Sequence, residues 1–241
     1  MNKPIIELEN ISFSYPDSNI KILDKLNFKV FKNDKIGIIA PNGSGKTTLF
    51  YTIMGLCKPF SGNIKILGKL VKTEKDFSFV RSKIGLMFQD ADDQLFSPTV
   101  LDDVAFGPLN LGYSNIDACD IAKKILYDLG LEEFENSITH RLSGGQKRLV
   151  AFASVLAMKP SILLLDEPTA GLDTNAKEKI EKILMNLDIS YIVISHEFNF
   201  INKITNKTVS MENGKIFKDD EVHIHQHEHI HKLGKLPHKH V

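Results

Sequence analysis

A glycine-rich segment at 40–47 is the feature that most constrains how this chain can fold. Residues 40–47 read Ala-Pro-Asn-Gly-Ser-Gly-Lys-Thr and lie between an apolar run at 35–39 and a helix-like stretch. Gly43 and Gly45 let consecutive backbone N–H groups approach one anion, and the helix N-terminus behind them adds positive potential. The usual motif begins with Gly, whereas this one begins with Ala40, which is tolerable where φ is negative. We therefore predict a strand, a phosphate-binding turn and a helix, in that order.

The side chains of this loop have separate expected roles at a nucleoside triphosphate. Lys46 would reach the β- and γ-phosphates, and the Thr47 hydroxyl would ligate Mg²⁺. ATP and Mg²⁺ are therefore the expected cofactors, and the alternative is a Gly-rich turn that merely precedes a lysine. The nucleotide-binding residues predicted from this loop are Asn42, Gly43, Ser44, Gly45, Lys46, Thr47 and Thr48.

A second apolar strand pattern ends in two carboxylates. Residues 161–165 read Ser-Ile-Leu-Leu-Leu, and Asp166 and Glu167 follow. In a strand parallel to the one before the phosphate loop, Asp166 would reach the Mg²⁺ shell and Glu167 a water in line with the γ-phosphate. Two carboxylates at a strand end can also be merely solvated. Together with the phosphate loop, the pair predicts an Mg²⁺ ligand at Asp166 and a general base at Glu167.

Further polar or aromatic residues stand where predicted strands end. Apolar and polar residues alternate in 5–15 and again in 20–30, which predicts an antiparallel pair of strands. Tyr15 would then lie at a strand end, where its ring either stacks on a nucleotide base or packs on the sheet. Gln89 follows a buried strand pattern and would touch Mg²⁺ or the attacking water, unless it is only a loop residue. His196 also follows a buried strand pattern. It would either contact the γ-phosphate or have a purely structural role.

Residues 99–158 are helical in character, with apolar spacing at Ile121, Ile125 and Leu129 and a stop at Gly130. We expect a helical subdomain at about 99–157, inserted into a mixed α/β core that has an antiparallel β subdomain. Residues 142–146 read Leu-Ser-Gly-Gly-Gln and open a helix. The exposed N–H groups and the Ser143 hydroxyl make a second potential anion cradle, to which Gly145 also belongs.

Composition argues against a nucleic-acid-binding protein and against a membrane-spanning one. The 241 residues are 42% hydrophobic and 25% charged, and 30 basic residues balance 30 acidic ones, so we expect no nucleic-acid partner. No apolar run approaches the roughly 20 residues that span a bilayer, and no signal peptide is expected. Cys57 and Cys119 are isolated and are expected to be reduced thiols.

Taken together, these stretches resemble the ATP-binding subunit of ABC transporters, a P-loop NTPase, over about residues 5–218. The family pattern departs at Ala40, at Glu197, where Asp commonly follows the histidine, and at Gly171. The resemblance implies an adenine-stacking aromatic, a glutamine that senses the membrane partner, a signature loop, an inter-subunit aspartate and a switch histidine. Tyr15 matches the adenine-stacking aromatic, and Gln89 matches the glutamine that senses the membrane partner. Residues 142–146 match the signature loop. Asp173 matches the inter-subunit aspartate, and His196 matches the switch histidine.

A narrower resemblance lies in residues 88–100, Phe-Gln-Asp-Ala-Asp-Asp-Gln-Leu-Phe-Ser-Pro-Thr-Val, and in residues 103–108. This pattern is similar to the ATPases of the energy-coupling-factor group, which includes importers of cobalt, nickel and vitamins. It implies an enzyme that couples ATP hydrolysis to transport. It does not choose the cargo.

The family resemblance also implies partners. Two subunits, either identical or paralogous, would sandwich two ATP molecules head to tail at the cytoplasmic face of the membrane, held there by integral membrane transporter subunits. A soluble ABC ATPase without a transport role and a P-loop kinase are the rival classes. Each γ-phosphate would touch Lys46, Gln89, Glu167 and His196 of one subunit and Ser143 and Gly145 of the other.

A histidine-rich tail at 219–241 follows the predicted ATPase domain at 1–218. Seven of the nine histidines lie in the final nineteen positions, and five of them alternate strictly. Alternate residues of an extended chain share one face at a spacing of about 7 Å, and imidazole is a good ligand for Ni²⁺ and Co²⁺. We therefore expect nickel or cobalt as cargo rather than a vitamin; the alternative is a disordered polar tail or an expression artefact. The alternating residues are His223, His225, His227, His229 and His231.

Overall fold

The computed structural model describes residues 3–16 and 18–218. The tail histidines predicted as metal ligands, His223, His225, His227, His229 and His231, lie outside the described residues.

The described strands form two sheets. The four-stranded sheet is antiparallel in the order β2-β1-β4-β5, and the six-stranded sheet has the order β10-β9-β3-β8-β7-β6, in which all neighbours except β10 and β9 run parallel. The predicted mixed α/β fold with an antiparallel β subdomain is confirmed. The strands are β1 (Ile6–Phe13), β2 (Leu23–Val30), β3 (Lys35–Ile39), β4 (Ser61–Ile66), β5 (Lys69–Val71), β6 (Ile84–Met87), β7 (Ile162–Asp166), β8 (Ser190–Ile194), β9 (Lys207–Glu212) and β10 (Lys215–Lys218).

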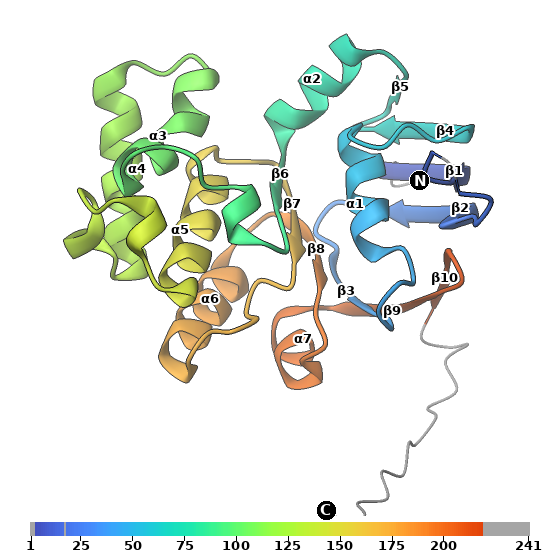
Figure 1. Ribbon diagram of the computed structural model, residues 1–241. Helices are drawn as coiled ribbons and strands as arrows, with labels where there is room; N and C mark the ends of the chain where they lie inside the picture. Colours follow the sequence, from blue (N-terminus) through green and yellow to red (C-terminus); the bar gives the residue numbers. More distant parts are fainter. Residues whose placement is uncertain (1–2, 17, 219–241) are drawn as a thin grey trace, which may run out of the picture.

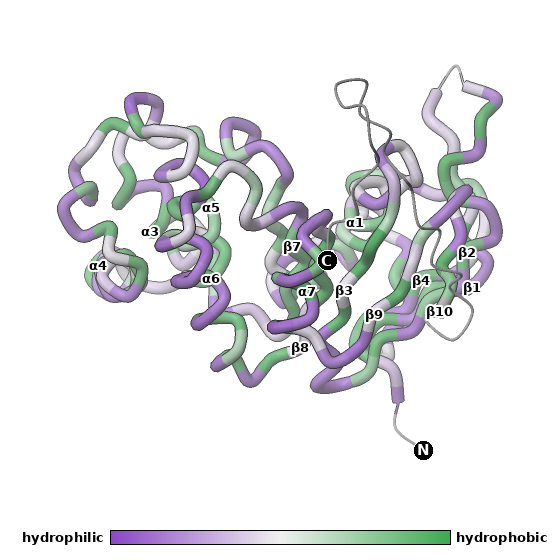
Figure 2. Tube along the Cα trace, turned by 90° about the horizontal axis from the view of Figure 1, so that it is seen from below, coloured by the Kyte–Doolittle hydropathy of each residue, from purple (hydrophilic) through white to green (hydrophobic). Residues whose placement is uncertain are grey.

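The helices divide into those that flank the sheets and those that extend away from them. Helices α3, α4 and α5 lie together at one end of the molecule, and the antiparallel strands lie at the other (Figures 1 and 2). We call residues 99–157 the helical arm. The helices are α1 (Lys46–Met54), α2 (Glu74–Lys83), α3 (Val100–Asn110), α4 (Asn115–Leu129), α5 (Gly144–Ala157), α6 (Thr174–Asn186) and α7 (Phe198–Ile204).

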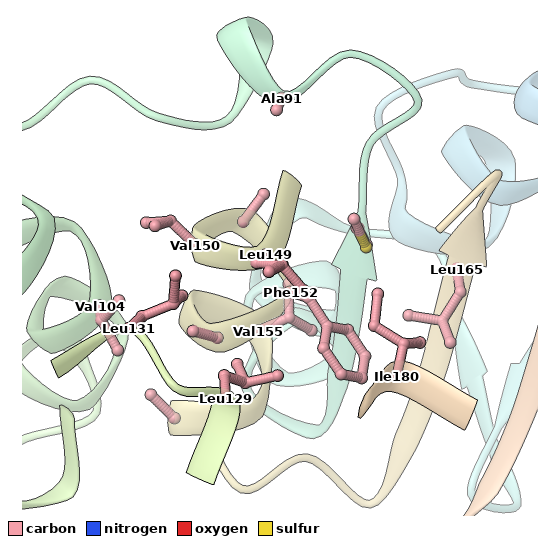
Figure 3. Close-up of a cluster of buried hydrophobic side chains, with 14 of the residues drawn as sticks. Ala91, Val104, Leu129, Leu131, Leu149, Val150, Phe152, Val155, Leu165 and Ile180 are labelled. Carbon is pink, nitrogen blue, oxygen red and sulfur yellow. The ribbon is translucent and has the colours of Figure 1, made fainter. Parts of the chain in front are cut away.

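Strand β7 is apolar up to its last residue, Asp166, because it is buried on both faces, as central parallel strands are. Ile162 and Leu164 belong to the core that α1 shares with both sheets. Leu163 and Leu165 belong to a second core, formed with the helical arm and α6. Figure 3 shows Phe152 of α5 and Leu165 of β7 in the same buried cluster, with Ile180 of α6 between them in this view, so the arm is anchored to the sheet through this core.

Polar caps define where the arm helices begin. Thr99, Ser114 and Ser143 are the N-caps of α3, α4 and α5, and each accepts a hydrogen bond from a backbone N–H in the first turn. Ser143 and Gln146 form a capping box. The signature-like sequence is therefore the start of α5, as the sequence predicts.

Residues 69–82 carry no clear sequence pattern, yet they form β5 and most of α2. Helix α2 buries only Val80, so its apolar periodicity is weak, but a capping box between Thr73 and Asp76 starts it. In the described part of the chain no helix has the length and apolarity that a bilayer span requires. Cys57 and Cys119 are both free thiols, as expected.

Candidate functional site

Four neighbouring strands of the parallel sheet end at one edge. The carboxyl ends of β3, β6, β7 and β8 carry the phosphate loop, Gln89, the Asp166–Glu167 pair and His196 respectively. Such an edge is where open α/β sheets bind their ligands. A cleft of about 370 Å³ lies there, lined by Tyr15, Ile22, Asn42, Gly43, Gly45, Lys46, Thr47, Thr48, Gln89, Asp166, Glu167 and His196.

Two glycines shape the phosphate loop. Gly43 and Gly45 have φ values of 77° and 101°, in the left-handed region that glycine adopts without strain. A Cβ at Gly45 would also lie 2.8 Å from the carbonyl oxygen of Ile22. Ala40, by contrast, has a negative φ, which explains why alanine is accepted there. The Ser44 hydroxyl is buried without a hydrogen-bond partner, which leaves a free donor in a loop built for an anion.

The Lys46 ammonium is folded onto its own loop. Its Nζ donates to the carbonyl oxygens of Ala40, at 2.8 Å, and Pro41, at 3.0 Å, which uses two of its three donors. Burial lowers the pKa of Lys46, and the Glu167 and Asp166 carboxylates oppose that shift. A cation held this close to glycine N–H groups fits a phosphate ligand.

Thr47 and Asp166 form a second polar pair at the base of the cleft. The Thr47 hydroxyl donates to Asp166 Oδ2 at 2.6 Å, and Asp166 is 2% exposed. Burial raises the pKa of Asp166, and the Thr47 hydrogen bond and the Lys46 charge oppose the shift. A hydroxyl and a carboxylate are the oxygen ligands that Mg²⁺ prefers, so these residues fit this ion.

Glu167 combines a strained backbone with a buried carboxylate. Its φ of 49° is left-handed, which costs a non-glycine residue about 1–3 kcal/mol. Its Oε1 lies 3.3 Å from His196 Nε2 but in a geometry that makes no hydrogen bond, so this buried oxygen is unpartnered. Burial raises the pKa of Glu167, and the neighbouring His196 opposes the rise. A carboxylate with raised proton affinity facing a cleft suits a general base.

His196 and Tyr15 border the same cleft. His196 Nε2 lies 3.2 Å from Asn42 Oδ1, which ties the loop after β8 to the phosphate loop. The Tyr15 ring packs edge-to-face on Phe13, with ring centroids 5.0 Å apart, and its hydroxyl is 3.1 Å from Thr48 Oγ1. Tyr15 is still 43% exposed, so it both packs on the sheet and borders the cleft.

The structure separates the predicted site residues into two groups. Apart from Ser44, all of those expected to act within one subunit line the cleft. Ser143 and Gly145 do not line it. The Ser143 hydroxyl instead caps α5, where it accepts from the Gln146 N–H at 3.3 Å.

Two residues of this region carry no signal in the sequence. Ile22 lines the cleft although it belongs to a stretch predicted only as strand. Arg148 of α5 donates to the backbone carbonyl oxygens of Glu167 and Gln89. Backbone-directed contacts leave no residue-type pattern, which is why neither was found.

A second cavity differs in character from this cleft. A groove of about 440 Å³ between α4, α5 and α6 is mainly apolar, lined by residues such as Ile125, Leu156 and Leu187. Residues 3–16 and 18–218 also hold no cluster of three or more His, Cys, Asp or Glu side chains that would bind a metal.

Comparison with known sequences connects this cleft to one family. The profile of the ABC transporter family matches residues 23–170. A protein described as an ABC transporter ATP-binding protein from Nitratidesulfovibrio vulgaris is 41% identical over 237 residues, covering 98% of this chain and 86% of the relative. The energy-coupling factor transporter ATP-binding protein EcfA of Methanocaldococcus jannaschii is 43% identical, covering 89% of this chain and 78% of the relative.

Solved structures are similar over the same range. The structure of cbiO1 from Clostridium perfringens, described as part of the ABC transporter complex cbiONQ, has a TM-score of 0.77 at 34% identity, covering 90% of this chain and 88% of cbiO1. The dimeric cassette MJ0796 bound to ADP and Pi has a TM-score of 0.81 at 29% identity, covering 88% of this chain and 98% of that one. The chain therefore belongs to the ABC transporter family as an ATP-binding subunit, and it is an ATPase that uses ATP with Mg²⁺.

Proposed function

We propose that this ATPase powers the import of nickel or cobalt through a membrane transporter of the energy-coupling-factor type. The observation that carries the choice of a metal is the strict alternation of the five histidines from His223 to His231. The similarity to EcfA and to cbiO1 supports the transporter type. The tail would buffer or sense the ion rather than form the transport path.

In this proposal the residues of the cleft divide the work of hydrolysis. Lys46 and the phosphate-loop N–H groups hold the phosphates, Tyr15 stacks on the base, and Gln89 and His196 contact the γ-phosphate. Thr47, Gln89 and Asp166 would hold Mg²⁺, which supplies neutralisation of phosphate charge when bound. Glu167 accepts the proton of the attacking water, consistent with its buried, unpartnered Oε1.

The site residues that lie outside the cleft, Ser143 and Gly145, support the presence of a second subunit. Ser143 and Gly145 begin a helix of the arm and do not line the cleft of their own chain. We propose that they complete the cleft of a partner, in a homodimer or in a heterodimer with a paralogous ATPase. The MJ0796 dimer supports this arrangement by similarity.

An exposed aromatic patch supports integral membrane subunits as further partners. Phe96 and Phe106 are 67% and 45% exposed, and their ring centroids lie 4.7 Å apart. Leu109 extends the patch along α3. Apolar side chains in such a patch mark interaction sites. Docking there would place the protein peripherally on the cytoplasmic face of the membrane, without a nucleic-acid partner.

We also propose a division of the chain into an ATPase domain at 1–218, with the helical arm inserted, and a tail at 219–241. An energy-coupling-factor vitamin importer is the alternative function, because the pattern at 88–100 is shared by both kinds of transporter. A soluble ABC ATPase without a transport role is the weaker alternative.

Uptake measurements separate the two cargo classes. Cells lacking this chain should lose uptake of radiolabelled nickel or cobalt while retaining vitamin uptake. Loss of vitamin uptake with normal metal uptake would overturn the metal assignment and favour the alternative.

Metal titration tests the tail directly. The full chain should bind Ni²⁺ and Co²⁺ measured by calorimetry, and a version ending at Asp220 should not. Binding should weaken as the pH falls through the imidazole pKa near 6.5, because protons compete for the same nitrogens. Equal binding by the two versions would remove the main support for a metal cargo.

A further inference from the structure

Arg148 is a charged side chain to which the proposed function assigns no role. It lies in α5, two residues after the signature-like sequence ends, and it is partly buried. Its Nη1 donates to the Glu167 carbonyl oxygen at 2.6 Å, and its Nη2 donates to the Gln89 carbonyl oxygen at 2.8 Å. One guanidinium therefore connects three segments that are distant in sequence.

The two carbonyl groups belong to adjacent strand ends. Gln89 follows β6 and Glu167 follows β7, and these strands pair in parallel with Met87 opposite Leu165. A planar guanidinium holds its donors in a fixed fork, so it sets the spacing of both loops from α5. A lysine ammonium at the same position would lack this fixed geometry.

The hydrogen bond from Arg148 is made to the backbone of Glu167, the proposed general base. Glu167 has a left-handed φ of 49°, and its backbone N–H and carbonyl oxygen take part in three hydrogen bonds. Its N–H donates to the Ile194 oxygen at 2.9 Å, and its carbonyl oxygen accepts from the Ala170 N–H at 3.2 Å and from Arg148 at 2.6 Å. The Arg148 bond is the shortest of the three and the one that comes from the helical arm.

We propose that Arg148 is a positioning residue, which holds the Glu167 peptide and the Gln89 loop at a fixed distance from α5. The orientation of the Glu167 carboxylate then depends on where the helical arm lies. This inference rests on the role proposed above for Glu167.

Steady-state ATP hydrolysis tests the proposal. Arg148→Met should lower kcat by about 10- to 100-fold, because a displacement of about 1 Å at a reacting group has effects of this size, while KM changes by less than about threefold. Arg148→Lys should have a kcat between those of Arg148→Met and the parent. Millimolar guanidinium should raise the kcat of Arg148→Ala part of the way to the parental value.

Lys147 is the matched control on the same helix. It forms an ion pair of 2.6 Å with Asp92, which also belongs to the segment after Gln89, but it touches neither Glu167 nor Gln89. Lys147→Met should keep kcat within about twofold of the parent. Thermal unfolding of each variant establishes that it is folded before its rates are compared.

A double variant separates positioning from a general loss of structure. If Arg148 acts through Glu167, Arg148→Met should add less than about twofold to the defect of Glu167→Gln in single-turnover hydrolysis. An equal loss in both backgrounds, or a parental kcat in Arg148→Met, would overturn the proposal. Parental turnover by Glu167→Gln alone would instead overturn the role of Glu167.

Discussion

Burial raises the pKa of the Glu167 carboxyl group above its ordinary value of 4.5, and the charge of His196 only partly opposes the rise. The folded protein therefore binds this proton more tightly than the unfolded chain does. The resulting stability is greatest below the ordinary value and declines as the pH rises through the raised one. At neutral pH the ionised carboxylate destabilises the fold, which is a common cost of a functional site.

Replacement by a neutral isostere should remove that cost. We expect Glu167→Gln to unfold about 2–4 °C above the parent at pH 7.5, with the difference shrinking towards pH 4, because both proteins are then uncharged at this position. The same variant should bind ATP but hydrolyse it slowly. Calorimetry across this pH range and a hydrolysis assay provide the measurements. A variant that is less stable than the parent at pH 7.5, or one with parental turnover, contradicts the assignment.

At the scale of elements, the parallel sheet is organised by close contacts between strands and helices. Strand β3 is hydrogen-bonded on both sides, to β8 and β9, and α7 packs across it. A Cβ on Gly37 would lie 2.4 Å from Cγ2 of the buried Ile201. Gly37 therefore sets how closely α7, which follows the His196 turn, approaches the sheet.

A double-mutant cycle measures this contact. Gly37→Ala should destabilise the protein by about 1–3 kcal/mol through overpacking, and Ile201→Ala by about 2–5 kcal/mol through the cavity it leaves. The double variant should cost less than the sum, because the new methyl group occupies space that Ile201 vacates. Denaturant unfolding gives the three free energies. Strict additivity would show that α7 does not pack on Gly37 as described.

At the scale of the whole molecule, the two groups of site residues lie on separate parts of the chain. The cleft is at the edge of the parallel sheet, and Ser143 and Gly145 start a helix of the arm. A contact that exists only with ATP present would therefore bias an equilibrium between separate and joined subunits.

The joined state should accumulate when hydrolysis is blocked. We expect Mg-ATP to convert the Glu167→Gln variant from monomer to dimer in analytical ultracentrifugation. The additional substitution Lys46→Ala should keep the protein monomeric, because it removes a phosphate contact. Monomers of Glu167→Gln at saturating Mg-ATP would contradict a homodimer and leave the heterodimer with a paralogue.

The sequence by itself determined the segments whose pattern is local. Each buried strand is a continuous apolar run followed by a polar or Gly-containing turn, so β3 with the phosphate loop, β7 with Asp166 and Glu167, and β8 with His196 were predictable. The parallel order of these strands then placed residues far apart in sequence at one edge. Thr47 and Asp166 were both predicted to lie at the Mg²⁺ position, and the structure joins them by a hydrogen bond of 2.6 Å.

Only the tertiary structure decided the contacts that have no local pattern. The fold of the Lys46 side chain onto the Ala40 and Pro41 carbonyl groups is one example, and the approach of the Ile22 carbonyl to Gly45 is another. Arg148 reaches backbone oxygens 19 and 59 positions away. Such contacts depend on the packing of the arm against the sheet. Every residue has a backbone carbonyl group, so the residue types in the sequence do not indicate which carbonyl oxygen accepts the hydrogen bond.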